Sequence, residues 1–167
     1  MTLHEFNILP EEQLIEELKK CCGSSAWVNK MLLFIPADNM IKLLEEAENQ
    51  WWKCSEADWK EAFAHHPMIG DINAIKKKFA ATAQWASGEQ GGMNASPGET
   101  VKALAEGNRL YEEKFGYIFI VCATGKSAEE MLGLLQERLK NKEGKEIKIA
   151  AGEQIKITKL RIEKLLE

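Results

Sequence analysis

The chain of 167 residues has the length of one domain, and its apolar share of 45% suffices for one substantial core, so we expect residues 1–167 to form a single domain. A net charge of -4, from charges of mixed sign, argues against a general nucleic-acid binder, which needs a basic face to neutralise phosphates. No apolar run approaches the roughly 20 residues that span a bilayer, and the N-terminus lacks the pattern of a signal peptide, so we expect a soluble, cytoplasmic protein that does not bind membranes.

The first 66 residues show four helical patterns, in which apolar residues recur every three or four positions. Each pattern follows a residue that suits a helix start, either a proline in the first turn or a side chain that caps the first N–H groups. These residues are Pro10, Ser24 or Ser25, Asp38, and Ser55, which resembles a capping box with Asp58. The fourth helix runs into His66, and Pro67 prevents its continuation.

A less regular region follows. The spacing of apolar residues after Asp71 predicts a short helix, and residues 80–96 then lose periodicity as glycines accumulate. Pro97 suits the first turn of a long helix, which we expect Gly116 to terminate.

The last third of the chain contains its only β-like run, residues 117–123. Because no second strand candidate can pair with this run, we interpret it as buried extended backbone between helices. Ser127 and Glu130 form the pattern of a capping box for the next helix, and the last helix begins near Glu143. The sequence therefore predicts an all-α fold, a single-domain bundle of about seven to nine helices with no sheet.

The cysteines predict neither a disulfide framework nor a metal site. None of the four, Cys21, Cys22, Cys54 and Cys122, belongs to a C-x-x-C pair, and two adjacent thiols cannot easily bind one tetrahedral ion. The usual signatures of nucleotide-binding loops, zinc proteases and serine hydrolases are also absent. We therefore expect reduced, partly buried thiols and no metal.

The end of the fourth helix carries the candidate for acid–base chemistry. The chain has three histidines, and two of them, His65 and His66, lie where that helix must stop. An imidazole at such a position can reach solvent or a ligand, and imidazole suits proton transfer near neutral pH. His4 lies in a terminus that we expect to fray. The residue pattern alone leaves open the alternative that His66 is only a partner of the helix dipole.

Arg161 falls at the edge of the apolar stripe of the last helix. There its stem can pack on the core while the guanidinium reaches a pocket. Spacing alone favours the alternative of an ordinary surface arginine.

Short motifs along nearly the whole chain are specific in their combined order and spacing. They are Phe6-Asn7 with Leu9, Cys21-Cys22-Gly23-Ser24 with Trp27, Asp58-Trp59 before Ala62-Phe63, His66-Pro67 with Ile69-Gly70-Asp71, Glu89-Gln90 after Trp85, Asn108 and Tyr111 before Phe115-Gly116, the run Phe119 to Ala123, and Ile157-Thr158 with Leu160-Arg161. In these motifs the sequence resembles the 2-oxo-4-hydroxy-4-carboxy-5-ureidoimidazoline (OHCU) decarboxylase family, which comprises cofactor-free helical enzymes of urate breakdown.

The resemblance implies an enzyme that decarboxylates OHCU to (S)-allantoin without a metal or an organic cofactor. It implies catalytic roles for His66, Glu89 and Arg161. The substrate-binding residues that it implies are Pro67, Ala86, Ser87, Gly88, Glu89, Gln90, Phe119, Ile120, Val121, Cys122, Ala123 and Arg161. The sequence departs from the family pattern at three positions: Ala26, Met68 and Ala86. A homodimer is common in the family, whereas the sequence itself does not give the oligomeric state.

The implied chemistry fits these residue types. The carboxylate that is lost lies next to a ring carbon whose neighbour is an imine, so the substrate itself accepts the electron pair and no cofactor is needed. His66 can exchange a proton with the substrate hydroxyl, and Arg161 offers a fork of donors to anionic oxygens. Glu89 and Gln90 can bind the ureido N–H groups.

Two alternatives come from other functional classes. A non-catalytic helical interaction module would leave Glu89 and Gln90 in a surface loop and Arg161 as a surface charge. A hydrolase of a related ureide on the same scaffold would share the polarity of the pocket, and fold alone does not separate it from a decarboxylase.

Overall fold

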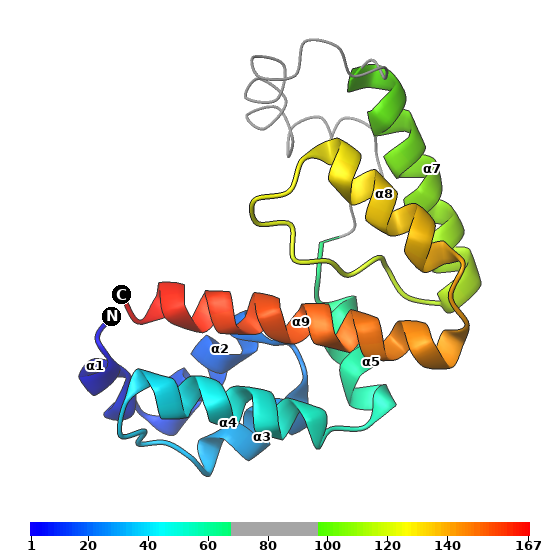
Figure 1. Ribbon diagram of the computed structural model, residues 1–167. Coiled ribbons are helices and arrows are strands. Elements are labelled where there is room, and N and C mark those ends of the chain that lie inside the picture. The colour runs from blue at the N-terminus through cyan, green and yellow to red at the C-terminus, as the bar shows by residue number, and fades with distance from the viewer. Residues whose placement is uncertain (68–96) are drawn as a thin grey trace. The chain divides into compact units, whose positions relative to one another are not determined.

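Eight α-helices make up the part of the chain that this computed structural model describes, residues 1–67 and 97–167 (Figure 1). The helices are α1 (Leu3–Asn7), α2 (Glu11–Cys21), α3 (Ser25–Leu32), α4 (Met40–Trp52), α5 (Glu56–Ala64), α7 (Pro97–Phe115), α8 (Ala128–Leu139) and α9 (Glu143–Leu165). No strand occurs within these two ranges, which confirms the predicted all-α fold. The short helix predicted after Asp71 and the irregular residues 80–96 lie outside the described residues.

Side-chain caps begin most of these helices, as the sequence indicates. Ser24, and not Ser25, caps α3, and Ser55 forms the predicted capping box with Asp58 at α5. At α8 only half of the predicted box forms, in which Ser127 accepts the N–H of Glu130 at 3.2 Å.

The predicted cap of α4 was wrong by one residue. The side chain of Asn39 accepts the Lys42 N–H at 2.9 Å and caps the helix. The Asp38 carboxylate instead pairs with the ammonium of Lys42 at 2.6 Å on the exposed surface. Both side chains can cap a helix, so the register of the first turn decides between them.

The chain folds into two compact units. The first comprises residues 1–66, 120–122 and 147–167, and the second comprises residues 67–119 and 123–146. The single domain expected from chain length stays a prediction.

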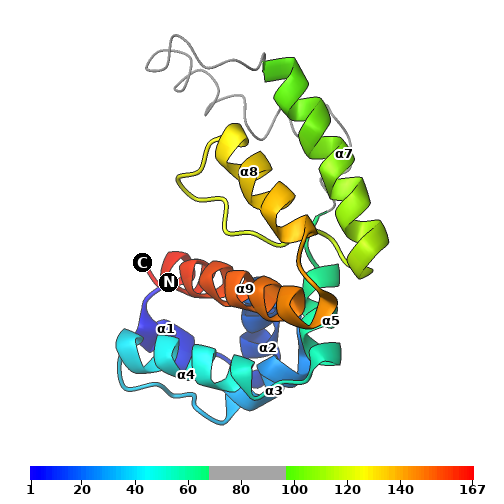
Figure 2. The ribbon, with the colours of Figure 1, turned by 45° about the vertical axis from the view of Figure 1, so that its right-hand side comes forward.

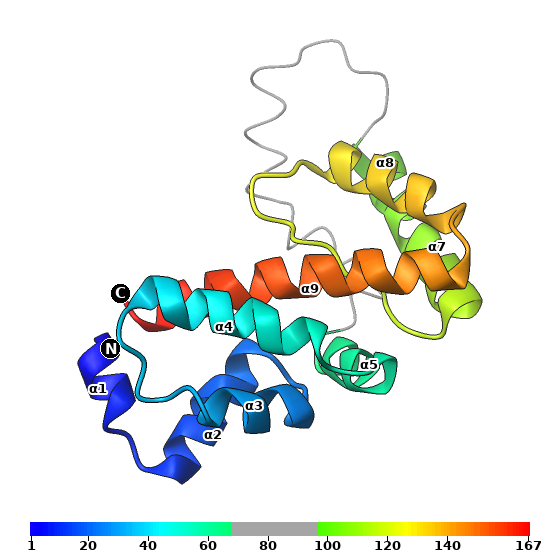
Figure 3. The same ribbon diagram turned by 60° about the horizontal axis from the view of Figure 1, so that its bottom comes forward.

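Tryptophans fix the core of the first unit. Trp27 donates its indole N–H to the Ala47 carbonyl oxygen at 2.9 Å, and Trp51 donates to that of Ala151 at 2.8 Å. Both rings are fully buried, so these bonds satisfy polar groups that water cannot reach. The second bond joins α4 to α9, which lie side by side in all three ribbon views (Figure 3). Helix α9 is thereby held along the core, with its predicted apolar stripe buried at Ile147, Ala151, Ile155, Ile162 and Leu166.

In the second unit, α7 and α8 pack closely against each other (Figure 2). A Cβ on Gly107 of α7 would lie 2.5 Å from a methyl carbon of Leu135 on α8, so the absence of a side chain permits this approach. Helix α7 ends at Phe115, and Gly116 adopts a φ of 81°, which confirms the predicted stop.

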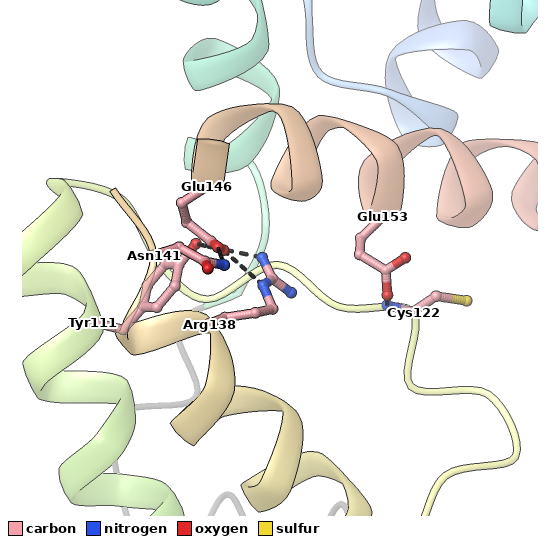
Figure 4. A network of polar contacts seen from close by, with 6 residues as sticks. All are labelled: Tyr111, Cys122, Arg138, Asn141, Glu146 and Glu153. Carbon is pink, nitrogen blue, oxygen red and sulfur yellow. Dashed lines mark hydrogen bonds and ion pairs between the residues drawn. The ribbon is translucent and has the colours of Figure 1, made fainter. Parts of the chain in front are cut away.

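The second unit contains a buried polar network (Figure 4). The carboxylate of Glu146 accepts from Arg138 Nε at 2.6 Å, from the Tyr111 hydroxyl at 2.6 Å, and from Asn141 Nδ2 at 2.9 Å. Arg138 also lies over the Phe119 ring, 4.5 Å from its centroid. The sequence pattern of α8 does not indicate that Arg138 is buried.

Residues 117–123 form no strand and connect the helices as extended backbone, as predicted. Tyr117, Ile120 and Cys122 are buried along it. Within residues 1–67 and 97–167, no helix combines the length and the apolar composition that a bilayer span requires.

Candidate active site

His66 lies just beyond α5, at the helix end that the sequence predicts. Helix α5 ends at Ala64, and the backbone N–H of His66 donates to the Phe63 carbonyl oxygen at 3.2 Å. Its side chain is half-buried, whereas that of the preceding His65 is exposed. A Cβ on Gly23 would overlap the ring of His65, so this glycine allows the end of α5 to pack against the turn after α2.

A hydrogen-bonded chain attaches the imidazole of His66 to α9. His66 Nε2 lies 2.5 Å from Oε1 of Gln154, whose side chain is 0% exposed. Gln154 Nε2 donates to the hydroxyl of Thr158 at 3.1 Å, and that hydroxyl donates to the Gln154 backbone carbonyl at 3.0 Å. The side-chain amide of Gln154 therefore has a hydrogen-bonding partner on its oxygen, which is His66, and one on its nitrogen, which is Thr158.

Glu153, the residue before Gln154, binds the segment 120–122 of the first unit. Its carboxylate accepts the backbone N–H of Cys122 at 3.3 Å (Figure 4) and pairs with Lys156 at 2.6 Å. Consecutive residues of α9 thus bind His66 and the backbone N–H of Cys122, which is a predicted substrate-binding residue.

Arg161 also belongs to α9. It lies seven residues after Gln154, which places it on nearly the same helix face, about 10 Å along the axis. Its Nη1 donates to the carbonyl oxygens of Lys20 and Cys21 at 3.4 and 3.3 Å, at the negative end of α2. Within the described ranges these are the only hydrogen bonds of its guanidinium, so its other N–H groups can serve a ligand.

The other predicted site residues belong to other parts of the chain. Ala86, Ser87, Gly88, Glu89 and Gln90 lie outside the described residues, as does Met68. Pro67, Phe119 and Ala123 belong to the second unit. The predicted site residues that belong to the first unit are therefore His66, Ile120–Cys122 and Arg161.

Sequence reasoning missed Glu153 and Gln154. Gln154 lies beside Ala151 and Ile155 in the apolar stripe, and a polar residue within such a stripe needs a hydrogen-bonding partner. That position could have marked Gln154 as a residue with a structural or functional partner, although it does not say which.

Three of the four thiols are not candidates for nucleophilic chemistry. All four cysteines are buried, as expected. Burial raises the pKa of Cys21 to about 11, that of Cys22 to about 12 and that of Cys54 to about 11, so these groups keep their protons at neutral pH. Among the described residues, no three His, Cys, Asp or Glu side chains gather in a way that could hold a metal ion.

Known proteins define the class to which this fold and site belong. The family model for OHCU decarboxylase matches residues 7–163. The chain is therefore a member of the OHCU decarboxylase family, as its motifs indicate.

Relatives of this chain include two-function proteins and shorter decarboxylases. A uric acid degradation bifunctional protein from Arabidopsis thaliana is 39% identical over 153 residues, which are 90% of this chain and 46% of that protein. An OHCU decarboxylase from Halalkalicoccus jeotgali is 24% identical over 166 residues, covering 99% of this chain and 92% of the relative. The chain spans less than half the length of the first curated relatives that it matches.

Two solved structures are similar to the fold. An OHCU decarboxylase crystallised in the presence of (S)-allantoin is 36% identical, with a TM-score of 0.69 over 90% of this chain and 96% of that one. An (S)-allantoin synthase is 14% identical, with a TM-score of 0.70 over 97% of this chain and 53% of the other. The second likeness concerns the fold alone.

Proposed function

We propose that this chain is a decarboxylase that converts OHCU to (S)-allantoin and carbon dioxide in urate catabolism. The family match from residue 7 to residue 163 supports the reaction. The observation that carries the proposal is the attachment of His66 and Arg161 to one face of α9, through Gln154 in the first case and directly in the second. His66, the proposed proton-transfer group, and Arg161, the proposed anion-binding group, then face the same region of the first unit.

In the proposed reaction, the bond between the ring carbon and the carboxylate breaks as carbon dioxide leaves. Its electron pair forms a double bond to the neighbouring ring carbon, and the imine electrons move to nitrogen, which takes up a proton. The resulting enol passes its hydroxyl proton to His66 and becomes a carbonyl as the neighbouring carbon is protonated. Protonation from one side of the ring gives one enantiomer.

Arg161 orients the substrate in this proposal. Its Nη1 contacts with the carbonyl oxygens at the end of α2 fix the plane of the guanidinium. The remaining donors form a fork that matches a carboxylate or a carbonyl oxygen. We assign Glu89 and Gln90 to the ureido group, and Ile120–Cys122, with Phe119 and Ala123, to the wall of the pocket.

The proposal also covers the cofactors, the location and the oligomeric state of the enzyme. We propose that it works without a metal or an organic cofactor, in the cytoplasm, as a single domain that forms a homodimer. Activity should then survive chelation and dialysis, and restoration by one particular metal after such treatment would contradict the cofactor-free mechanism.

Mass analysis of the product separates the proposed reaction from its alternatives. OHCU is generated from urate in the reaction vessel, with and without the protein. Decarboxylation gives a faster loss of substrate and a product that lacks the carboxylate. A hydrolase of the ureide would give a product that keeps the carboxylate and has gained water, and an interaction module would leave the spontaneous rate unchanged.

A further inference from the structure

We propose that Gln154 fixes the proton of neutral His66 on Nε2 and thereby makes Nδ1 the nitrogen that accepts a proton from the substrate. Gln154 is in this account a positioning residue, because it acts through His66. The role in turnover rests on the proposed function, whereas the protonated nitrogen can be measured without any substrate.

The orientation of the Gln154 amide follows from the hydroxyl of Thr158. That hydroxyl has one proton, which it donates to the Gln154 backbone carbonyl at 3.0 Å. Toward the Gln154 side chain, 3.1 Å away, it can therefore present only a lone pair. The NH₂ group of the amide must face Thr158, and its oxygen must face His66.

The buried thiol of Cys22 supports this orientation. It lies within hydrogen-bonding reach of Thr158, and burial raises its pKa to about 12. At neutral pH Cys22 is therefore a thiol and not a thiolate, so no negative charge draws the Thr158 proton away from the backbone carbonyl.

The orientation of the amide decides the protonation of His66. A carbonyl oxygen accepts and cannot donate, so the contact of 2.5 Å requires a proton on His66 Nε2. A neutral imidazole has one N–H, so its lone pair is then on Nδ1. Because Gln154 is fully buried and held by Thr158, it cannot turn its amide without breaking two bonds.

Nitrogen NMR of the full chain tests the protonated nitrogen directly. With ¹⁵N-labelled histidine the chain gives signals from three side chains, and His66 is assigned by its loss in His66→Asn. The spectrum is recorded at increasing pH until the His66 signals no longer change, which gives the neutral ring. We expect the N–H signal of His66 on Nε2 and the lone-pair signal on Nδ1. A proton on Nδ1 would overturn the proposal.

Variants test whether Gln154 is the cause. Gln154→Met removes the amide at similar size and should give a mixture of the two neutral forms. Thr158→Val removes the hydroxyl that orients the amide of Gln154. It should likewise increase the share of neutral His66 that carries its proton on Nδ1. Gln154→Glu keeps an accepting oxygen and should retain the proton on Nε2. An unchanged ¹⁵N spectrum in Gln154→Met would overturn the proposal.

Kinetics test the consequence for turnover. Gln154→Met should lower kcat by roughly ten- to a hundredfold with little change in KM, which is less than the ~10²–10⁴-fold contribution of general acid–base catalysis because the imidazole of His66 remains. Gln50→Met is the matched control, because Gln50 is also a buried glutamine of the first unit, whose amide donates to Glu46 at 3.0 Å. It should leave kcat unchanged with a similar change in Tm.

The two measurements separate the two proposals. If the protein does not accelerate the formation of allantoin, the proposed decarboxylase is wrong, and the NMR result still decides whether Gln154 sets the protonation of His66. If the protein is active but Gln154→Met matches Gln50→Met in kcat, the role of Gln154 in turnover is wrong while the proposed function stands.

Discussion

The guanidinium of Arg138 pairs with the carboxylate of Glu146 at 2.6 Å, and the two side chains are only 7% and 0% exposed. Tyr111 and Asn141 donate to the same carboxylate, so the buried negative charge has partners on both oxygens. A charge that loses such a partner in the interior cannot be compensated by water. Removal of Arg138 alone would therefore leave a buried charge without its cation.

Arg138→Met should destabilise the protein by about 3–5 kcal/mol, because it leaves Glu146 buried without its cation. Arg109 offers a matched control, since it forms ion pairs with Glu106 and Glu113 that are exposed on α7. Arg109→Met should cost about 1 kcal/mol or less. Urea unfolding measures both, and equal effects of the two variants would show that the buried pair has no special role.

His66→Asn should lower kcat by about a hundredfold or more while the protein keeps its helical content and its Tm. The amide can reproduce part of the hydrogen bonding but cannot exchange a proton at neutral pH. His65→Asn is the control, because His65 is exposed and packs on Gly23. Circular dichroism and turnover of OHCU are measured together, and near-normal activity in His66→Asn would remove His66 from the mechanism.

Arg161→Lys should lower kcat/KM by roughly ten- to a hundredfold, since the loss of one charge-assisted hydrogen bond costs about 1.5–3 kcal/mol. Lysine keeps the charge and most of the stem but lacks the planar fork. Stability should change little, which a thermal melt beside the kinetic assay establishes. A loss of activity that unfolding accounts for fully would instead make Arg161 structural.

Stability should fall as pH rises from about 9 towards 12. Cysteines in the unfolded chain lose their protons near their ordinary pKa of 9.0, whereas burial holds the pKa of Cys22 at about 12 and that of Cys54 at about 11. Between these values the unfolded state binds fewer protons than the folded state, so the free energy of unfolding decreases with pH.

Urea titrations at a series of pH values measure this slope, and Cys54→Ala should make it shallower. The tyrosines contribute in the same direction, because burial raises the pKa of Tyr117 to about 12 from its ordinary value of 10.0. A stability that rises through this range would contradict the assignment of buried, protonated thiols.

Local signals along the chain predicted much of the fold. Ser55 and Gly116 act on the few residues beside them, so their roles as cap and stop could be predicted from neighbouring positions, whereas the sequence left Ser24 and Ser25 open as the cap of α3. The choice of Asn39 over Asp38 as the cap of α4 depends on one residue of register, which the apolar spacing does not resolve. Caps and stops depend on residues that are adjacent in sequence. The exact first residue of a helix does not follow from the spacing of its apolar residues.

The partners of the site residues could not be predicted in this way. His66 and Gln154 are 88 residues apart, and the partners Cys122 and Glu153 are 31 apart. Such pairs depend on how α5, the extended segment and α9 pack, which no local pattern encodes. Family resemblance predicted roles for His66 and Arg161, whereas the structure was needed to identify Gln154 and Glu153 of α9 as the partners of His66 and of the Cys122 N–H.

The chirality of the product tests the proposed decarboxylation most directly. OHCU generated from urate decays spontaneously to racemic allantoin, so circular dichroism of the product reports only the enzymatic route. With the wild-type protein we predict faster formation of allantoin and the signal of the (S) enantiomer, both lost in His66→Asn. Racemic allantoin formed at the spontaneous rate in the presence of folded wild-type protein would contradict the proposed function.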